Sequence, residues 1–290
     1  MFKDVDSVLK NLLAILMIGL AFSNADGQDF PTYLKKYAVK IDKLDSLNNN
    51  IYDLISDYKL IMIGEMHGTN EPAKFVIGLT ELMTNKGDSV QVGFEISTDQ
   101  MTEFLHNHSD KSISSSDFFS KNSLDGRASF AWAEAISRLN KNPNVNIFFY
   151  DVNDGESKTF DDRDSIMCLK IKNKIKEHPS WKTVTLSGNI HNMLLPYKGK
   201  TKMALYLSND KELNISAKIC SLNHYYQSGT MLNNTGNGLE MHQIDNQDWD
   251  YAKLVDYDNY LFLFPINMTD SYSGIYFTRK VTAAKLVNGK

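Results

Sequence analysis

Cysteine is scarce in this sequence, and Cys168 and Cys220 are the only two. Two thiols so far apart in the chain do not form a disulfide framework, and neither has the paired spacing of a zinc knuckle. The sequence therefore predicts two buried free thiols, with a single disulfide bridge as the alternative in an oxidising compartment.

A surplus of charge of one sign is absent as well. Lysine and arginine total 31, aspartate and glutamate total 35, and both signs are mixed along the chain. Because nucleic acid needs a basic stripe on the protein surface, we expect no nucleic-acid partner. A chain of 290 residues, 42% of them hydrophobic, can bury a substantial core, and no break in composition calls for a second domain.

Long hydrophobic runs are also missing, although the N-terminus has a short one. Residues 12–22 are apolar, about half of the roughly 20 residues that a membrane span needs. Small residues follow, with Ala25 and Gly27 as candidate cleavage positions, which is the pattern of a signal peptide over residues 1–27. We therefore expect a secreted or periplasmic protein with no stable membrane span after cleavage. Asp4 and Asp6 weaken the positive start, so an uncleaved interfacial anchor or a buried helix is the alternative.

Strand and helix patterns alternate over most of the remaining chain, which is typical of an α/β fold. Continuous apolar runs predict strands buried on both faces. They lie at residues 59–64, 90–96, 145–150, 183–186 and 203–207. Helix patterns separate them, and a further helix is expected over residues 44–58. Beyond residue 207 only residues 260–264 and 274–281 look like strands. We expect residues 28–290 to form one α/β domain with a mostly parallel sheet.

Polar residues stand where the first two of these strands end. Glu65 and His67 follow the first strand, and a carboxylate and an imidazole so close in sequence can hold a water or a metal between them. Glu95 ends the second strand, where a carboxylate must be solvated, paired with a cation or poised for proton transfer. The structural alternatives are that Glu65 satisfies loose backbone groups and that Glu95 forms an ion pair. If the chemistry is intact, the site carries unneutralised charge that costs stability, so Glu95→Gln is expected to stabilise the fold.

Later strand ends add further candidates. His191 repeats the Gly-x-x-His pattern of His67, and Arg163 stands at the start of a helix from which it can reach the site. Asp164, beside it, is expected to favour the helix dipole. The alternatives are a satisfied histidine and a solvated helix start. Asp151 is a weaker candidate. The other histidines are expected at the surface: His106, His108, His178, His224 and His242. Since carboxyl ends of parallel strands share one edge, we expect a single polar site of Glu65, His67, Glu95, Arg163 and His191.

These residues resemble the clan of erythromycin-esterase-like enzymes, ChaN-like haem-uptake proteins and TraB/TIKI proteins. Gly-x-x-His occurring twice is similar to the TraB/TIKI and ChaN-like pattern. His67-Gly68-Thr69 with Glu71 and Glu95, and Arg163-Asp164 followed by Met167, look like the esterases. The esterases usually place one more residue between the motif glutamate and its histidine. The resemblance implies a three-layer α/β fold with its site at the carboxyl ends of the strands. It implies no single reaction, because members include metal-independent ester hydrolases, metal-dependent proteases and haem binders.

Our main hypothesis is a hydrolase of an ester or amide bond in a small molecule or peptide. His67 is the general base on water, Glu65 and Glu95 orient it, and Arg163 and His191 stabilise the oxyanion. In a metal-bound version, His67, His191 and Glu95 hold a divalent metal ion. The alternative is a ChaN-like haem or iron carrier without catalysis, and a third reading is a domain that kept the fold without the chemistry. Substrate identity and oligomeric state are not predicted.

Overall fold

The computed structural model describes residues 30–121, 125–156, 160–234, 236–246, 254–265 and 270–289. The chain divides after Tyr37 into two units, which are described separately. In the first unit, helix α2 (Phe30–Tyr37) is described, whereas the expected signal peptide and the boundary at residue 28 lie outside the described residues. None of the described helices combines the length and the apolar character that a membrane crossing requires.

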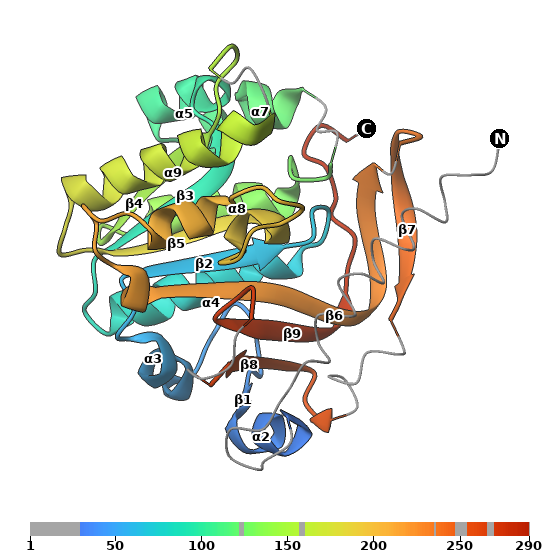
Figure 1. Ribbon diagram of the computed structural model, residues 1–290. Helices are drawn as coiled ribbons and strands as arrows, with labels where there is room; N and C mark the ends of the chain where they lie inside the picture. Colours follow the sequence, from blue (N-terminus) through green and yellow to red (C-terminus); the bar gives the residue numbers. More distant parts are fainter. Residues whose placement is uncertain are drawn as a thin grey trace. The chain divides into compact units, whose positions relative to one another are not determined.

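The second unit is built on a sheet that has nine strands in the described part of the chain. Their order is β1-β8-β9-β6-β2-β5-β3-β4, and β7 pairs with residues 228–234 of β6 (Figure 1). Five pairings are parallel and three are antiparallel, so the predicted mostly parallel sheet is confirmed. The strands are β1 (Val39–Lys40), β2 (Leu60–Glu65), β3 (Val90–Ser97), β4 (Val145–Asp151), β5 (Lys182–Gly188), β6 (Ile219–Asn234), β7 (Leu239–Asp245), β8 (Asn259–Leu263) and β9 (Gly274–Val281).

Helices connect these strands and cover both faces of the sheet (Figure 1). The α-helices of this unit are α3 (Asn49–Ile55), α4 (Glu71–Asn85), α5 (Thr102–Asn107), α6 (Asp110–Ser115), α7 (Asp117–Ser120), α8 (Phe130–Asn140), α9 (Phe160–Glu177) and α10 (Met203–Ser208). Short 3-10 turns are η2 (Asp99–Met101), η3 (Asn189–Asn192) and η4 (Ser216–Lys218). Of these, η3 directly follows β5 and carries one of the two site histidines.

Strand β2 divides the core into two clusters, because successive side chains of a strand point to opposite faces. Ile61 and Ile63 pack in the cluster that includes buried side chains of α3, α4 and α8. Leu60 and Met62 pack in the other, with side chains of α9 and α10. Each such side chain, when fully buried, contributes about 1.5–3 kcal/mol. The fold is therefore the expected three-layer α/β arrangement of helices, sheet and helices.

Both cysteines are buried and free, as the sequence predicts. Cys220 belongs to the cluster on one face of the sheet and Cys168 to the cluster on the other. The sheet therefore separates the two thiols, which explains why they are not bridged.

One predicted strand is wrong, since residues 203–207 form helix α10. Met203 and Leu207 are buried and lie one helical turn apart, whereas Tyr206 is exposed. The backbone N–H of Tyr206 donates to the carbonyl of Lys202, a bond across one helical turn. A short apolar run fits a strand and a buried helix equally well, and here its packing against α9 decides. The helix expected over residues 44–58 is present only as the shorter α3.

Strand β6 takes a central place in the sheet, beside β2, although its sequence predicts irregular structure. Asparagine, serine and tyrosine interrupt its apolar pattern. The strands expected at residues 260–264 and 274–281 are confirmed as β8 and β9. Since the parallel strands β2, β3, β4 and β5 end at one edge of the sheet, the residues that follow them are brought together there.

Candidate functional site

The first part of the site is a pair formed by Glu65, the last residue of β2, and His67. Nδ1 of His67 lies 2.5 Å from Oε1 of Glu65, and Nε1 of Trp132 donates to Oε2 at 3.2 Å. The Glu65 side chain is fully buried, whereas the His67 side chain is 22% exposed. Because a carboxylate accepts at Nδ1, the proton of the neutral imidazole belongs there. Nε2 is then left as a basic nitrogen without a hydrogen-bond partner among the described residues.

The charges around His67 set its basicity. Burial is the largest effect and lowers the pKa of His67, and the Arg127 charge lowers it too. The hydrogen bond and charge of Glu65, with the charge of Glu95, outweigh both, so the pKa is raised above its usual 6.5. The protonated imidazole therefore stabilises the fold below about pH 6.5, and that contribution is lost as the pH rises through the raised pKa.

The second part of the site is the carboxylate of Glu95 near the end of β3, which is fully buried. Its Oε2 accepts from the backbone N–H of Gly188 at 2.7 Å, and its Oε1 accepts from Arg163 at 2.6 Å and Arg127 at 3.1 Å. Burial is the largest effect and raises the pKa of Glu95, but the charges of His191, Arg127 and other neighbours hold it well below its usual range. Glu95 therefore anchors two guanidinium groups, which is the ion-pair alternative left open above.

Arg163 is held by a second carboxylate. Its Nε and Nη2 donate to the two oxygens of Asp151, at the end of β4, at 2.8 Å and 2.7 Å. This two-point geometry fixes the plane of the guanidinium. The side chain stays 22% exposed, and its Nη1 has no acceptor in the described part of the chain. Asp151, a weaker candidate in the sequence, thus belongs to the site as the group that orients Arg163.

The third part of the site is His191 on η3. Its Nδ1 lies 2.7 Å from Oδ1 of Asp164, and its Nε2 lies 3.7 Å from Oε1 of Glu95. Asp164 also accepts from the backbone N–H of Met203 at 3.0 Å and from Nζ of Lys202 at 3.1 Å. Asp164 lies beyond the first turn of α9, and its carboxylate contacts His191, Lys202 and the backbone of Met203. The prediction that Asp164 interacts with the helix dipole is therefore wrong.

The two histidines come together at Gly188. A Cβ atom added to Gly188 would lie 3.1 Å from Nε2 of His67 and 3.7 Å from Cδ2 of His191. Any larger residue at this position would fill the space between the imidazoles. The glycine of the second Gly-x-x-His pattern therefore leaves room at the site, and the structure brings all five residues of the expected site into one cluster.

Sequence reasoning missed Arg127 and Trp132. Neither follows a strand: Arg127 lies in the loop before α8, and Trp132 lies on α8. One signal was available, because only four of the 31 basic residues are arginines. Two of those four, Arg127 and Arg163, donate to Glu95. Where arginine is this rare, each one is a candidate for two-point recognition of a carboxylate.

His224 was expected at the surface, and this prediction is wrong. It lies on β6 with 2% of its surface exposed, and its ring stacks on Tyr276 with centroids 4.4 Å apart. Nε2 lies 2.7 Å from Oγ1 of Thr278, and burial lowers the pKa of His224 to about 3. It is a neutral core residue. The unpredicted strand β6 explains the error, because a polar stretch in a loop would have been exposed.

The loop that carries His67 is held down by β6. The backbone N–H of Leu232 donates to the carbonyl of Gly68 at 2.9 Å, and Nδ2 of Asn233 donates to the carbonyl of His67 at 3.3 Å. The carbonyl of Leu232 also lies so close to Gly126 that a Cβ there would be 2.2 Å away. The far half of β6 therefore packs on two loops of the site at once.

Gly68→Ala is expected to lower the free energy of unfolding by about 3 kcal/mol. Gly68 has φ +89°, and its added Cβ would lie 1.9 Å from the carbonyl oxygen of Leu232. The left-handed conformation costs about 1 kcal/mol and the overpacking about 2 kcal/mol more. Gly87→Ala is the matched control, because Gly87 has φ +96° and nothing within 4 Å. Urea unfolding of both variants measures the difference, and equal losses would contradict the close contact with β6.

A divalent metal fits these residues poorly. In the described part of the chain, no group of three or more histidine, cysteine, aspartate or glutamate side chains is placed to hold a metal ion. A cation bound to Glu95 would also face the charges of Arg127 and Arg163. The metal site predicted from His67, His191 and Glu95 therefore gains no support from the geometry. The haem-binding alternative stays a prediction.

No protein-family model and no curated protein matches this sequence. Solved structures match in fold. A Bacillus cereus protein has a TM-score of 0.62 at 9% identity, covering 88% of this chain and 98% of its own. A succinoglycan biosynthesis protein has a TM-score of 0.60 at 8% identity, and the match covers 91% of this chain and 99% of that protein. The erythromycin esterase EreC has a TM-score of 0.58 at 11% identity, and the match covers 83% of this chain and 96% of EreC. That structure is of a variant with one histidine replaced by asparagine, in its open conformation.

At these identities the likeness establishes a shared fold. The resemblance to erythromycin-esterase-like proteins that the sequence suggested is thus confirmed for the architecture of the chain. What the site does is a separate question, because one fold can carry unrelated reactions.

Proposed function

We propose that this protein is a metal-independent hydrolase that cleaves an ester or amide bond of a small molecule or peptide. The observation that carries the proposal is the pair of His67 and Glu65. The buried Glu65 carboxylate accepts the hydrogen bond of Nδ1 of His67 and thereby orients the ring. Nε2 is left open beside Gly188, which is the arrangement of a general base. An esterase of the same fold is in keeping with this reaction class.

The reaction needs one proton carrier and one group that stabilises negative charge. Nε2 of His67 takes a proton from water as the water oxygen adds to the carbonyl carbon of the substrate. The tetrahedral oxyanion accepts hydrogen bonds from Nη1 of Arg163 and Nε2 of His191. When the intermediate collapses, the bond to the alcohol or amine breaks, and His67 returns its proton to that leaving group.

The two histidines have different surroundings, which supports different roles. His67 has one carboxylate at Nδ1 and an open Nε2. His191 lies between two carboxylates, Asp164 at Nδ1 and Glu95 near Nε2. A carboxylate thus lies near each of its ring nitrogens, which places both nitrogens as hydrogen-bond donors. Glu95 acts in this scheme as a positioning residue that holds both arginines and the N–H of Gly188.

The pH dependence of hydrolysis tests the role of His67. We expect kcat/KM to rise with pH through a pKa above 6.5, because the base must be deprotonated and its pKa is raised. In Glu65→Gln the charge that raises the pKa of His67 is lost, while burial and Arg127 still lower that pKa. The pH at which kcat/KM rises should therefore move to lower values. The maximal rate should also fall about tenfold or more, because the imidazole is a weaker base and is less well oriented.

A panel of chromogenic esters, assayed over the pH range for wild type and Glu65→Gln, provides the measurement. Glu103→Gln is the control, because Glu103 is an exposed glutamate on α5. If kcat/KM rises at the same pH in Glu65→Gln as in the wild type, His67 is not the titrating base.

A further inference from the structure

The indole N–H of Trp132 has no part in the mechanism above, although it donates to the carboxylate that orients the base. Nε1 of Trp132 lies 3.2 Å from Oε2 of Glu65, and Nδ1 of His67 lies 2.5 Å from Oε1. Each carboxylate oxygen of Glu65 thus has one hydrogen-bond partner in the described part of the chain. Trp132, Glu65 and His67 form a chain of two hydrogen bonds that leads to the open Nε2.

The packing of Trp132 fixes the direction of its hydrogen bond. Only 1% of the residue is exposed, and its ring lies against Phe94 and Phe118, with centroids 5.6 Å and 6.3 Å away. Its backbone N–H donates to Oγ of Ser129, the residue that caps α8, at 3.3 Å. A ring packed in this way cannot turn away without opening a cavity. The N–H therefore stays directed at Glu65.

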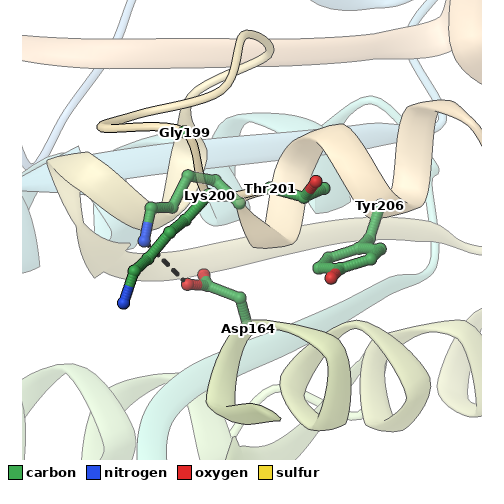
Figure 2. A pocket seen from close by; sticks show the side chains of 6 residues that line it. Asp164, Gly199, Lys200, Thr201 and Tyr206 are labelled. Atoms are coloured by element: carbon green, nitrogen blue, oxygen red, sulfur yellow. Dashed lines mark hydrogen bonds and ion pairs between the residues drawn. The ribbon is translucent and has the colours of Figure 1, made fainter. Parts of the chain in front are cut away.

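The second histidine of the site is held by a similar chain with a different outer donor. Oδ1 of Asp164 lies 2.7 Å from Nδ1 of His191, and Oδ2 accepts from Nζ of Lys202 at 3.1 Å. The dashed line in Figure 2 marks the contact of Asp164 with Lys202. The outer donor is thus a cation for His191 and a neutral indole for His67. A cation on Glu65 would offset the charge of the carboxylate, whereas an indole orients the carboxylate and leaves its charge in place.

We propose that Trp132 is a positioning residue for the general base, because it holds Oε2 of Glu65 so that Oε1 faces His67 without retaining the proton of the imidazole too strongly. This role rests on the proposed function, in which His67 takes a proton from water. Without the indole N–H, the buried carboxylate would have His67 as its only hydrogen-bond partner among the described residues. The protonated imidazole would then be favoured, because it neutralises a charge that is otherwise poorly solvated.

Other charged or titratable groups face this chain, and Trp132→Phe changes none of them. They are Glu95 from β3, Arg127 from the loop before α8, His191 from η3, Tyr150 from β4 and Tyr276 from β9. Burial raises the pKa of both tyrosines, so their phenols stay neutral. The charges of Glu95 and Arg127 act on His67 with opposite signs. A change in the titration of His67 in this variant therefore reports on the indole hydrogen bond.

Nuclear magnetic resonance of the wild type tests the chain without any substitution at Trp132. The indole N–H of Trp132, assigned from its contacts with the ring of Phe94, should shift with pH at the same midpoint as the ring of His67, because hydrogen bonds in a chain polarise one another. In His67→Asn this response should disappear, while that of Trp181, whose ring stacks on His178, should stay. A Trp132 indole that does not follow His67 overturns the chain.

Trp132→Phe keeps an aromatic ring and removes the N–H. We expect the midpoint of His67 to move to higher pH by about half a pH unit or more, because the carboxylate loses a donor. The opposite sign is expected for Glu65→Gln, so the two variants separate a lost donor from a lost charge. Trp181→Phe is the matched control, because Trp181 precedes β5 and Gly188 ends it. An unchanged midpoint in Trp132→Phe, or the same change in Trp181→Phe, overturns the role of Trp132.

Ester hydrolysis tests whether the chain serves the reaction. In Trp132→Phe we expect kcat to fall about tenfold and KM to change by less than about twofold, because a buried indole orients the base without touching the substrate. The rise of kcat/KM with pH should also move to higher pH.

The outcomes separate the two proposals. Hydrolysis that rises at the same pH and rate in Trp132→Phe and the wild type would overturn the role of Trp132 and leave the hydrolase intact. A Trp132 indole that follows His67, together with a raised midpoint in Trp132→Phe but no cleavage of any ester, would support the hydrogen-bond chain and overturn the proposed function.

Discussion

Glu95→Gln is expected to lower the free energy of unfolding by about 3 kcal/mol. The substitution removes the charge to which Arg127 and Arg163 both donate, within a fully buried cluster. Breaking a buried ion pair costs about 3–5 kcal/mol. The lower end applies here, because Arg127 keeps Asp125 and Arg163 keeps Asp151 as partners. Urea unfolding near neutral pH measures the loss.

Glu103→Gln on α5 is the control for this experiment, because the same atoms change at an exposed position. It should stay within about 0.5 kcal/mol of the wild type. A Glu95→Gln variant as stable as the wild type, or more stable, would mean that Glu95 is the strained, unpaired charge that the sequence left open. The ion-pair account of its carboxylate would then be wrong.

His67→Asn is expected to lower kcat for ester hydrolysis by about 100- to 10,000-fold, the usual contribution of a general base. Asparagine can donate to Glu65 as the imidazole does, so the buried carboxylate keeps a partner. It has no basic nitrogen to take a proton from water. KM should change little, because the base contributes to the transition state more than to binding.

His106→Asn is the matched control, since His106 is an exposed histidine on α5. Both variants should unfold at temperatures close to that of the wild type, which separates a lost base from a lost fold. A His67→Asn variant within threefold of wild-type kcat would exclude His67 as the base, by comparison with the loss that general-base catalysis implies.

The part of this site that the sequence predicts is the part that follows strands. Glu65, Glu95 and His191 each stand at or next to the end of a buried apolar run, and parallel pairing then places them at one edge. The prediction depends on two local signals, strand length and the polar residue that follows it. Both can be recognised without knowledge of tertiary contacts.

The partners of these residues could not be predicted in the same way. Whether Glu95 is a base or an anchor depends on Arg127, which comes from a loop far along the chain. Asp164 stands beside Arg163 in sequence, but its contact with His191 depends on how α9 packs against the sheet. Such contacts follow from the assembled layers, and no local periodicity encodes them.

The errors in the fold have a similar origin. The run at residues 203–207 is apolar enough for a strand, but its packing against α9 makes it helix α10. The polar sequence of β6 hides a strand that pairs with β2 on one side and with β9 on the other. His224 was misplaced for the same reason, because a central strand buries polar residues that a loop exposes.

The account as a whole depends on water that is activated at His67 and that attacks the substrate directly. The most direct test is turnover of an ester in water labelled with heavy oxygen, with mass spectrometry of the released acid and of the protein. The account predicts one heavy oxygen in each molecule of acid, and no acyl group on the protein at any time. An acyl adduct on a histidine of the site, or no turnover of any ester or amide, would contradict it.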